Sequence, residues 1–336
     1  MQDFLVGFQI KLYDYLLDTL QTFFRYPAHF LLRKLGRFQV LRNWVIYWRL
    51  HKRRSPDCVP LPDTTQTVQP VSSVVKPLQT RKAAVVLRRH GLLTGLQLGA
   101  APLSALQTFA RQTLCYGDRD PACPFNYGQH ALAQTTYQRT FALANYPTVG
   151  QTSVLQQLRQ DPTILEIAEN YLQVPPVFVG SELWWSFAAS TDPLTQCKAA
   201  QVFHCDIDDY RAIRFFFYLT DVDAHSGPHM YIQGSHRQKS WLHQLAGGRA
   251  TEASLKVFYG DTAITTIHGP AGIGFAEDSF GYHMGQPPQT TDRLMLVMLF
   301  TMQDYGAHPG LRPLRSRPAQ STKPSPAAFL TSASIA

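Results

Sequence analysis

The sequence has few cysteines and no feature that would mark a secreted or membrane-spanning protein. Its five cysteines are an odd number, and none of them forms the C-x-x-C pair of a zinc site. No run of about 18 uncharged apolar residues is present to cross a bilayer. Charges interrupt every apolar run near the N-terminus, and no small-residue cleavage site follows. We therefore expect a protein of the reducing cytoplasm.

Acidic residues are scarce at both ends of the chain. Residues 1–54 carry ten Lys or Arg and three acidic residues, and residues 306–336 carry four basic residues and no acidic one. Residues 55–305 have 17 basic and 20 acidic residues, so the body is slightly acidic although the whole chain has a net charge of +8. Because the positive charge does not belong to the body, a nucleic-acid-binding core is disfavoured, and we expect no nucleic-acid partner.

Residues 1–54 are expected to form a basic amphipathic helical arm. Apolar residues recur at helical spacing on both sides of Pro27, which interrupts the pattern. The second helix has only basic charges and is rich in Trp and Tyr, which suits peripheral contact with an anionic membrane surface. Docking of the apolar faces on the protein's own core or on a partner is the alternative. The apolar positions are Leu5, Phe8, Leu12, Leu16, Leu20 and Phe23 in the first helix, and Leu31, Leu35, Phe38, Leu41, Val45 and Trp48 in the second.

Composition divides the rest of the chain into three parts. Residues 55–80 are rich in Pro, Ser and Thr and have little periodicity, as expected of a linker. Residues 81–305 have the composition of a globular domain. Residues 306–336 are rich in Pro, Ser and Arg, which predicts a disordered basic tail.

The body should begin with a strand-like run and a glycine turn over residues 83–98. Helices are expected over 104–114 and 161–172, where Asp161 suits the N-cap and Pro162 the first helical position. The second helix should bury a stripe of four residues, Ile164, Leu165, Ala168 and Leu172.

From residue 176 the apolar pattern changes to short β-branched and aromatic runs separated by Gly, Pro, Asp and Ser. Strands at such intervals indicate an antiparallel sandwich or barrel, and the expected fold is mainly β with flanking helices (α+β). The runs cover residues 176–190, 200–208, 212–222, 229–235, 272–278 and 293–303.

The run over 200–208 contains an H-x-D pair, His204 and Asp206. Side chains two positions apart on a strand project from the same face, so the pair could place one nitrogen and one oxygen ligand on a single metal ion. A catalytic iron site of the 2-His-1-carboxylate type needs a second histidine. His283 is the best candidate, because the other downstream histidines lie in predicted turns or connections, whereas His283 precedes a short loop and a strongly apolar strand.

That apolar strand begins with Arg293. Burying a guanidinium is costly without an anion, and its planar fork suits a carboxylate, either from the protein or from a ligand. Asp292 is adjacent but would point to the other face of the strand. A bound dicarboxylate therefore becomes a candidate partner, and exposure of Arg293 at the strand end is the alternative.

Four segments together resemble the phytanoyl-CoA dioxygenase family of Fe(II)- and 2-oxoglutarate-dependent oxygenases. These are HCDIDD, FFFYLTDVD, SGPHMYIQGSHR and GYHMGQPPQTTDR, and the resemblance covers roughly residues 80–305. It implies a double-stranded β-helix (a jelly roll, cupin-like). It also implies that His204, Asp206 and His283 bind iron, that Arg293 binds the far carboxylate of 2-oxoglutarate, and that Tyr218 touches this cosubstrate.

The resemblance implies a reaction that uses Fe(II), 2-oxoglutarate and O₂, with ascorbate as a candidate stimulant. A small organic substrate would be hydroxylated, with release of succinate and CO₂. Halogenating relatives have a small residue where this chain has Asp206, so its carboxylate favours hydroxylation or a related oxidation. The resemblance leaves the substrate, the oxidative outcome and the oligomeric state open.

Two other functions fit parts of the pattern. A cupin-type metal enzyme that does not use 2-oxoglutarate would share the barrel, but its sites usually gather several histidines and do not call for Arg293. A non-catalytic, membrane-associated module on the same fold would explain the basic arm. It would lie at the inner membrane surface, and it would not need an intact set of metal ligands.

Overall fold

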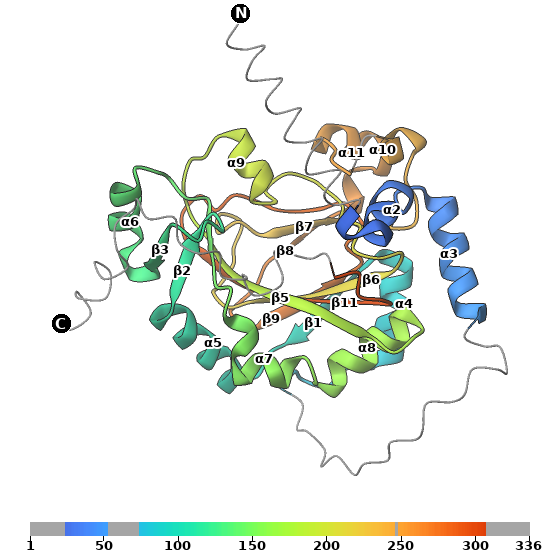
Figure 1. Ribbon diagram of the computed structural model, residues 1–336, viewed down its shortest axis with the longest axis horizontal. Helices are drawn as coiled ribbons and strands as arrows, with labels where there is room; N and C mark the ends of the chain where they lie inside the picture. The colour runs from blue at the N-terminus through green and yellow to red at the C-terminus, as the bar shows by residue number, and fades with distance from the viewer. Residues whose placement is uncertain (1–23, 53–73, 246–247, 307–336) are drawn as a thin grey trace, which may run out of the picture.

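The computed structural model describes residues 24–52, 74–245 and 248–306, and its β strands form two antiparallel sheets (Figure 1). The larger sheet has eight strands in the order β1-β9-β6-β11-β5-β4-β2-β3, and the smaller has three in the order β10-β7-β8. The strands of the larger sheet are β1 (Leu92–Gln97), β2 (Leu114–Gly117), β3 (Pro124–Asn126), β4 (Leu143–Asn145), β5 (Val177–Ser186), β6 (Ala212–Tyr218), β9 (Ile273–Glu277) and β11 (Arg293–Thr301). Those of the smaller sheet are β7 (His229–Ile232), β8 (Ile264–Ile267) and β10 (His283–Gly285).

Helices cover the outer face of the larger sheet and the outside of the smaller one. In Figure 1, α5, α7 and α8 lie below the larger sheet, and α10 and α11 lie above β7. The helices are α2 (Pro27–Leu35), α3 (Gln39–Lys52), α4 (Thr80–His90), α5 (Ala100–Gln112), α6 (His130–Tyr137), α7 (Ser153–Leu158), α8 (Pro162–Leu172), α9 (Pro193–Lys198), α10 (Trp241–Leu245) and α11 (Glu252–Tyr259). Short 3₁₀ turns are found at Tyr127–Gln129, Val149–Gln151 and Asp261–Ala263.

Successive side chains of strand β11 point to opposite faces of the larger sheet and contribute to a separate apolar cluster on each face. Leu294 and Leu296 pack with residues of the covering helices in the largest apolar cluster. Met295 and Val297 point the other way, into a cluster that includes Tyr231 of the smaller sheet. The interior between the sheets is therefore bounded by both, and the predicted mainly β fold with flanking helices is confirmed. Two facing antiparallel sheets are the arrangement expected of a jelly roll.

The expectation of a strand-like run from residue 83 is wrong, because this segment is helix α4. Ala83, Ala84 and Leu87 are buried at helical spacing, whereas Val85 and Val86 face solvent. Gly91 ends the helix in the left-handed region, with φ +79°, and β1 follows directly. Apolar residues on one helical stripe outweigh the strand propensity of two valines.

The expected strand over 200–208 is also absent. Instead, neighbouring backbone N–H groups bond to different segments, so no ladder can form. His204 pairs with His283 through two backbone hydrogen bonds of 3.0 and 2.9 Å, Cys205 donates to the carbonyl of Gly248, and Asp206 donates to that of Ser279. The H-x-D pair thus lies on a loop between α9 and β6 that is fixed from three sides.

Helix α8 forms as expected. Asp161 accepts hydrogen bonds from the N–H groups of Thr163 (2.9 Å) and Ile164 (3.1 Å), and Pro162 begins the helix. The buried stripe contains Ile164, Ala168 and Leu172 as predicted, while Leu165 is only half-buried. The helix expected over 104–114 corresponds to α5, which begins four residues earlier and ends at Gln112, before Leu114 begins β2.

The ends of the chain are described in part. The second helix of the predicted arm corresponds to α2 and α3, whereas the first helix, most of the linker and the tail beyond Gly306 lie outside the described residues. Within the described ranges, no helix is both long and apolar enough to span a bilayer.

Candidate metal centre

Three predicted ligands lie together at one end of the interior between the sheets. His204 and Asp206 come from the loop before β6, and His283 is the first residue of β10. One ligand atom of each residue can be chosen so that all three atoms lie within 4.8 Å of one another. The backbone pairing of His204 with His283 brings together two ligands that are far apart in the sequence.

Both histidines present the same ring nitrogen to this centre. The Nδ1 of His204 lies 2.9 Å from the carbonyl oxygen of Val202, and the Nδ1 of His283 lies 2.9 Å from that of Gly281. A carbonyl can only accept, so each Nδ1 carries a proton and the lone pair of the neutral imidazole is on Nε2. The two Nε2 atoms lie 3.9 and 3.7 Å from carboxylate oxygens of Asp206.

Arg214 keeps the Asp206 carboxylate ionised. Its Nη2 lies 3.0 Å from Asp206 Oδ2 and 2.8 Å from Asp208 Oδ2. Burial alone would raise the pKa of Asp206, but Arg214, His204 and His283 outweigh it and hold that pKa well below its ordinary value. The third predicted ligand is therefore an anion throughout the neutral pH range.

The two histidines have different proton affinities. Burial and the neighbouring His283 lower the pKa of His204 to about 4. Burial also opposes protonation of His283, but Glu277 and Asp206 outweigh it and raise the pKa of His283 to about 8. Metal binding would have to displace the His283 proton, as is usual for an imidazole ligand.

A buried Glu277–His229 pair lies behind His283 and was not predicted. Glu277 Oε2 is 2.8 Å from His229 Nε2, and Oε1 is 3.6 Å from His283 Nδ1. Burial alone would raise the pKa of Glu277, but His283 and His229 together lower it. His229 lies between a predicted turn and the strand expected over 229–235, and it is the buried first residue of β7. The sequence signal was Glu277 itself, a charged residue that directly follows the apolar run GIGFA.

Arg293 is buried, not exposed at a strand end, and no carboxylate of the described residues forms an ion pair with it. Its Nη1 donates to the carbonyl of Gly227 and its Nη2 to Ser186 Oγ (3.1 Å). Its Nε has no hydrogen-bond partner in the described part of the chain. Burial accordingly lowers the pKa of Arg293. A buried cation with donor capacity to spare is the expected form of an anion site.

Gly285 lies beside this guanidinium, whereas the adjacent Asp292 does not contact it. A Cβ on Gly285 would lie 2.9 Å from Arg293 Nη2, so only glycine fits beside it without a shift. Asp292 points away as expected, because its carboxylate accepts hydrogen bonds from Tyr127 Oη (3.1 Å) and the Ala188 N–H (2.8 Å).

Tyr218 lies in the same interior but its hydroxyl is engaged by the backbone. It accepts from the N–H of His229 (2.7 Å) and donates to the carbonyl of Ile267 (3.0 Å). It thereby ties β6 to β7 and β8, and its contact with a cosubstrate stays a prediction.

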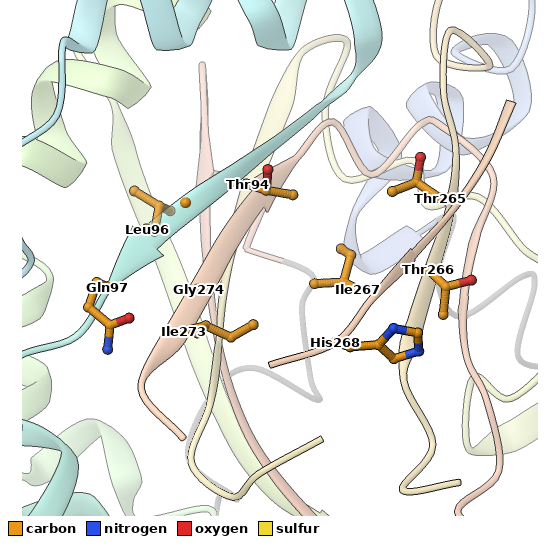
Figure 2. A pocket seen from close by; sticks show the side chains of 10 residues that line it. Thr94, Leu96, Gln97, Thr265, Thr266, Ile267, His268, Ile273 and Gly274 are labelled. Atoms are coloured by element: carbon orange, nitrogen blue, oxygen red, sulfur yellow. The ribbon is translucent and has the colours of Figure 1, made fainter. Parts of the chain in front are cut away.

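A cavity of about 280 Å³ lies elsewhere, between β1, β9 and β8. Figure 2 shows Thr94 and Gln97 on one side of it and Thr265, Thr266 and His268 on the other. None of its lining residues is a predicted ligand or Arg293.

No protein-family model matches the sequence, and neither does any curated protein. Similar solved structures include the non-heme α-ketoglutarate-dependent epimerase SnoN from nogalamycin biosynthesis, which is 15% identical over 70% of this chain and 92% of its own, with a TM-score of 0.47. HygX from Streptomyces hygroscopicus, with nickel and 2-oxoglutarate bound, is 15% identical over 66% of this chain and 87% of its own, with a TM-score of 0.47. EctD from S. alaskensis is 19% identical over 67% of this chain and 77% of its own, with a TM-score of 0.46. Identity below 20% makes the site's own residues the basis for assigning a function.

Proposed function

We propose that this protein is an Fe(II)- and 2-oxoglutarate-dependent oxygenase that oxidises a small organic substrate. The observation that carries the proposal is the pairing of a His204–Asp206–His283 centre with a buried Arg293 that has no carboxylate partner among the described residues. The first suits a divalent metal, and the second suits the distal carboxylate of a dicarboxylic acid that chelates this metal.

The donor set fits iron. Two neutral imidazole nitrogens and one carboxylate are the ligands of the 2-His-1-carboxylate iron site, which leaves further coordination positions open. The fixed Nδ1–H groups orient both rings, and Glu277 lies against the far side of His283. Asp206 fills the position that would have to be vacant for a bound halide, which favours hydroxylation or a related oxidation.

Arg293 fits the cosubstrate. A guanidinium can hold a carboxylate through two parallel hydrogen bonds, and Gly285 leaves its Nη2 approachable. When bound together, iron and 2-oxoglutarate supply O₂ activation and oxidation of a C–H bond, with release of succinate and CO₂. The chain's part is to bind and orient both. The four sequence motifs favour the phytanoyl-CoA dioxygenase family within this class.

Anaerobic titration of the Fe(II)-loaded protein with 2-oxoglutarate tests the proposal. The wild type should develop the visible charge-transfer band of a chelated 2-oxo acid. Arg293→Met should lower the affinity for 2-oxoglutarate by about a hundredfold, since two charge-assisted hydrogen bonds are lost. Gly285→Ala should lower this affinity by about tenfold, because the added methyl group displaces the guanidinium. Neither change should alter Fe(II) affinity.

Arg237→Met, at an exposed arginine, is the matched control and should leave the titration unchanged. Asp206→Ala or His204→Ala should abolish substrate-linked succinate formation. Iron binding without any 2-oxoglutarate band would reject the proposal in favour of a cupin-type enzyme. Absence of both would favour a non-catalytic module.

A further inference from the structure

Helix α3 packs against the body with mainly polar residues and turns its aromatic residues outward. Gln39, Arg42 and Arg49 face the body, together with the apolar Ile46 and Leu50. The opposite stripe consists of Val40 (85% exposed), Trp44 (60%), Tyr47 (60%) and Trp48 (48%). These positions recur at helical spacing, so they form one face. A surface helix that packs on its own core normally has the reverse orientation.

The contacts of the polar side hold this orientation. Arg42 Nη1 donates to the carbonyl of Asp209 (3.1 Å), and its guanidinium lies 3.9 Å from the ring centroid of Phe280. Arg49 Nη1 forms a 2.9 Å ion pair with Asp209, and its Nη2 donates to Tyr305 Oη (2.6 Å). Rotating α3 to bury its tryptophans would break these bonds and leave a buried Asp209 without its cationic partner.

The neighbouring helices α2 and α10 also carry exposed apolar side chains. Gln39 links α3 to α10, because its N–H donates to Gln244 Oε1 (2.9 Å) and its Oε1 accepts from the Lys239 N–H (3.2 Å). Figure 1 shows α2 between α3 and the α10–α11 pair. We define the α2–α3–α10 surface by its exposed apolar side chains, which are nine of the sixteen large ones exposed in the described residues: Leu31, Leu35, Val40, Trp44, Tyr47, Trp48, Trp241, Leu242 and Leu245. Such a concentration marks an interaction site.

Unpaired cations border this surface. Arg25, Arg33 and Lys34 are exposed, Arg37 is half-buried, and none of the four forms an ion pair within the described part of the chain. Residues 24–52 and 236–245 contain no Asp or Glu. A large apolar area with tryptophans, on segments whose only charged residues are cationic, matches the interface of an anionic lipid bilayer. A symmetric contact with a second copy would instead bring like charges together.

We propose that the α2–α3–α10 surface lies on an anionic phospholipid bilayer. Its tryptophan and leucine side chains occupy the boundary between headgroups and acyl chains, and Arg25, Arg33, Lys34 and Arg37 contact lipid phosphates. This binding site lies outside the proposed metal centre, and its test does not use activity.

Flotation of the full chain with phosphatidylcholine vesicles, prepared with or without phosphatidylserine, tests the proposal. The wild type should bind only where phosphatidylserine is present, and high salt should weaken binding. The variant Trp44→Ser with Trp48→Ser should bind at least about tenfold more weakly, because two exposed aromatic anchors are removed. The triple variant Arg33→Gln, Lys34→Gln and Arg37→Gln should have an affinity for these vesicles lower by on the order of a hundredfold, since each cation contributes about fivefold.

The variant Val85→Ser with Leu132→Ser is the control, since it removes exposed apolar side chains outside the surface. It should bind like the wild type, and circular dichroism should show that all variants are folded. Equal vesicle binding by the wild type and the tryptophan variant would overturn the proposal. So would a dimer of the wild type that the tryptophan variant abolishes, if the wild type does not float, because a second copy would then occupy the surface.

Discussion

Lys239 is a buried lysine whose ammonium group lies against aromatic rings. Its Nζ is 3.7 Å from the ring centroid of Tyr282 and 4.6 Å from that of Phe280, and only 8% of the residue is exposed. Burial lowers the pKa of Lys239 from 10.5 to about 8, although the Cys205 thiol opposes this shift. The charged form is therefore stabilised less in the folded protein than in the unfolded chain.

This difference predicts a pH-dependent stability. Below about pH 8 both states hold the proton and the folded state bears the full cost of the buried charge, of order 3 kcal/mol. As pH rises from about 8 to about 10, the folded state releases the proton first, so this cost declines and stability rises. Lys239→Met should raise the free energy of unfolding by about 1–3 kcal/mol at neutral pH, and the gain should shrink above pH 8.

Urea denaturation at several pH values measures this effect. Lys82→Met, at an exposed lysine, should show no pH-dependent gain. Destabilisation by Lys239→Met at every pH would mean that the aromatic contacts of the ammonium outweigh the cost of its burial.

At the residue scale, the sequence could identify polar side chains whose positions a packed core alone does not explain. Arg293 before seven apolar residues and His283 before its loop both stood out in this way, and both are buried in the interior. Arg214 and the Glu277–His229 pair did not stand out, because their roles depend on partners brought close only by the fold. A charge in a strand signals burial, but it does not say which distant group will pair with it.

At the scale of elements, Asp161 joins two segments through one carboxylate. Its Oδ1 caps α8, while Oδ2 accepts hydrogen bonds from the N–H groups of Val74 (2.7 Å) and Val75 (3.1 Å). Val75 also pairs with Leu98, so the chain just before α4 is fixed against the body. The helix start and the chain entry are therefore stabilised together.

Asp161→Asn should separate these two functions. The amide oxygen can still cap α8, but the amide NH₂ would face two N–H donors, and stability should fall by about 2 kcal/mol. Asp161→Ala should cost more, because the cap is lost as well. Limited trypsin digestion should cut faster after Arg81, in the first turn of α4, in both variants. Asp192→Asn, at the similar but exposed cap of α9, should leave cleavage at Arg81 unchanged.

Helix caps were predictable because they depend on local sequence, as the Asp161–Pro162 start of α8 shows. Helix α4 was not, since Val85 and Val86 resemble a strand until the burial of Ala83 and Leu87 is known. The H-x-D segment likewise resembles a strand, but its N–H groups bond to three separate segments. In both cases tertiary contacts decided the local structure, and a single sequence does not show them.

At the scale of the whole molecule, a bound metal would cross-link two distant parts of the chain. His204 and Asp206 precede β6, and His283 belongs to the smaller sheet. A divalent metal at one hundred times its Kd should stabilise the folded state by about 2.7 kcal/mol, and a chelator should reverse this effect. Thermal unfolding with Mn²⁺ or anaerobic Fe²⁺ measures it.

Asp206→Ala should remove the metal-dependent shift in Tm, whereas Asp261→Ala, at an exposed carboxylate, should preserve it. An equal shift in both variants would place the metal elsewhere. The uneven charge of the chain was readable from composition, but the outward orientation of the α3 aromatic face was not, because it depends on Asp209 in a distant loop.

Asp209 lies three residues after Asp206 and accepts from Arg49 and from the Gln303 N–H (2.9 Å), while its backbone carbonyl accepts from Arg42. One residue thus connects the surface helix, the loop with two ligands and the end of β11. Events at the surface and at the metal centre would then be thermodynamically reciprocal: if lipid contact raises the affinity for iron, iron must raise the affinity for lipid by the same factor. Location in the cell would then act as an effector of the proposed oxygenase activity.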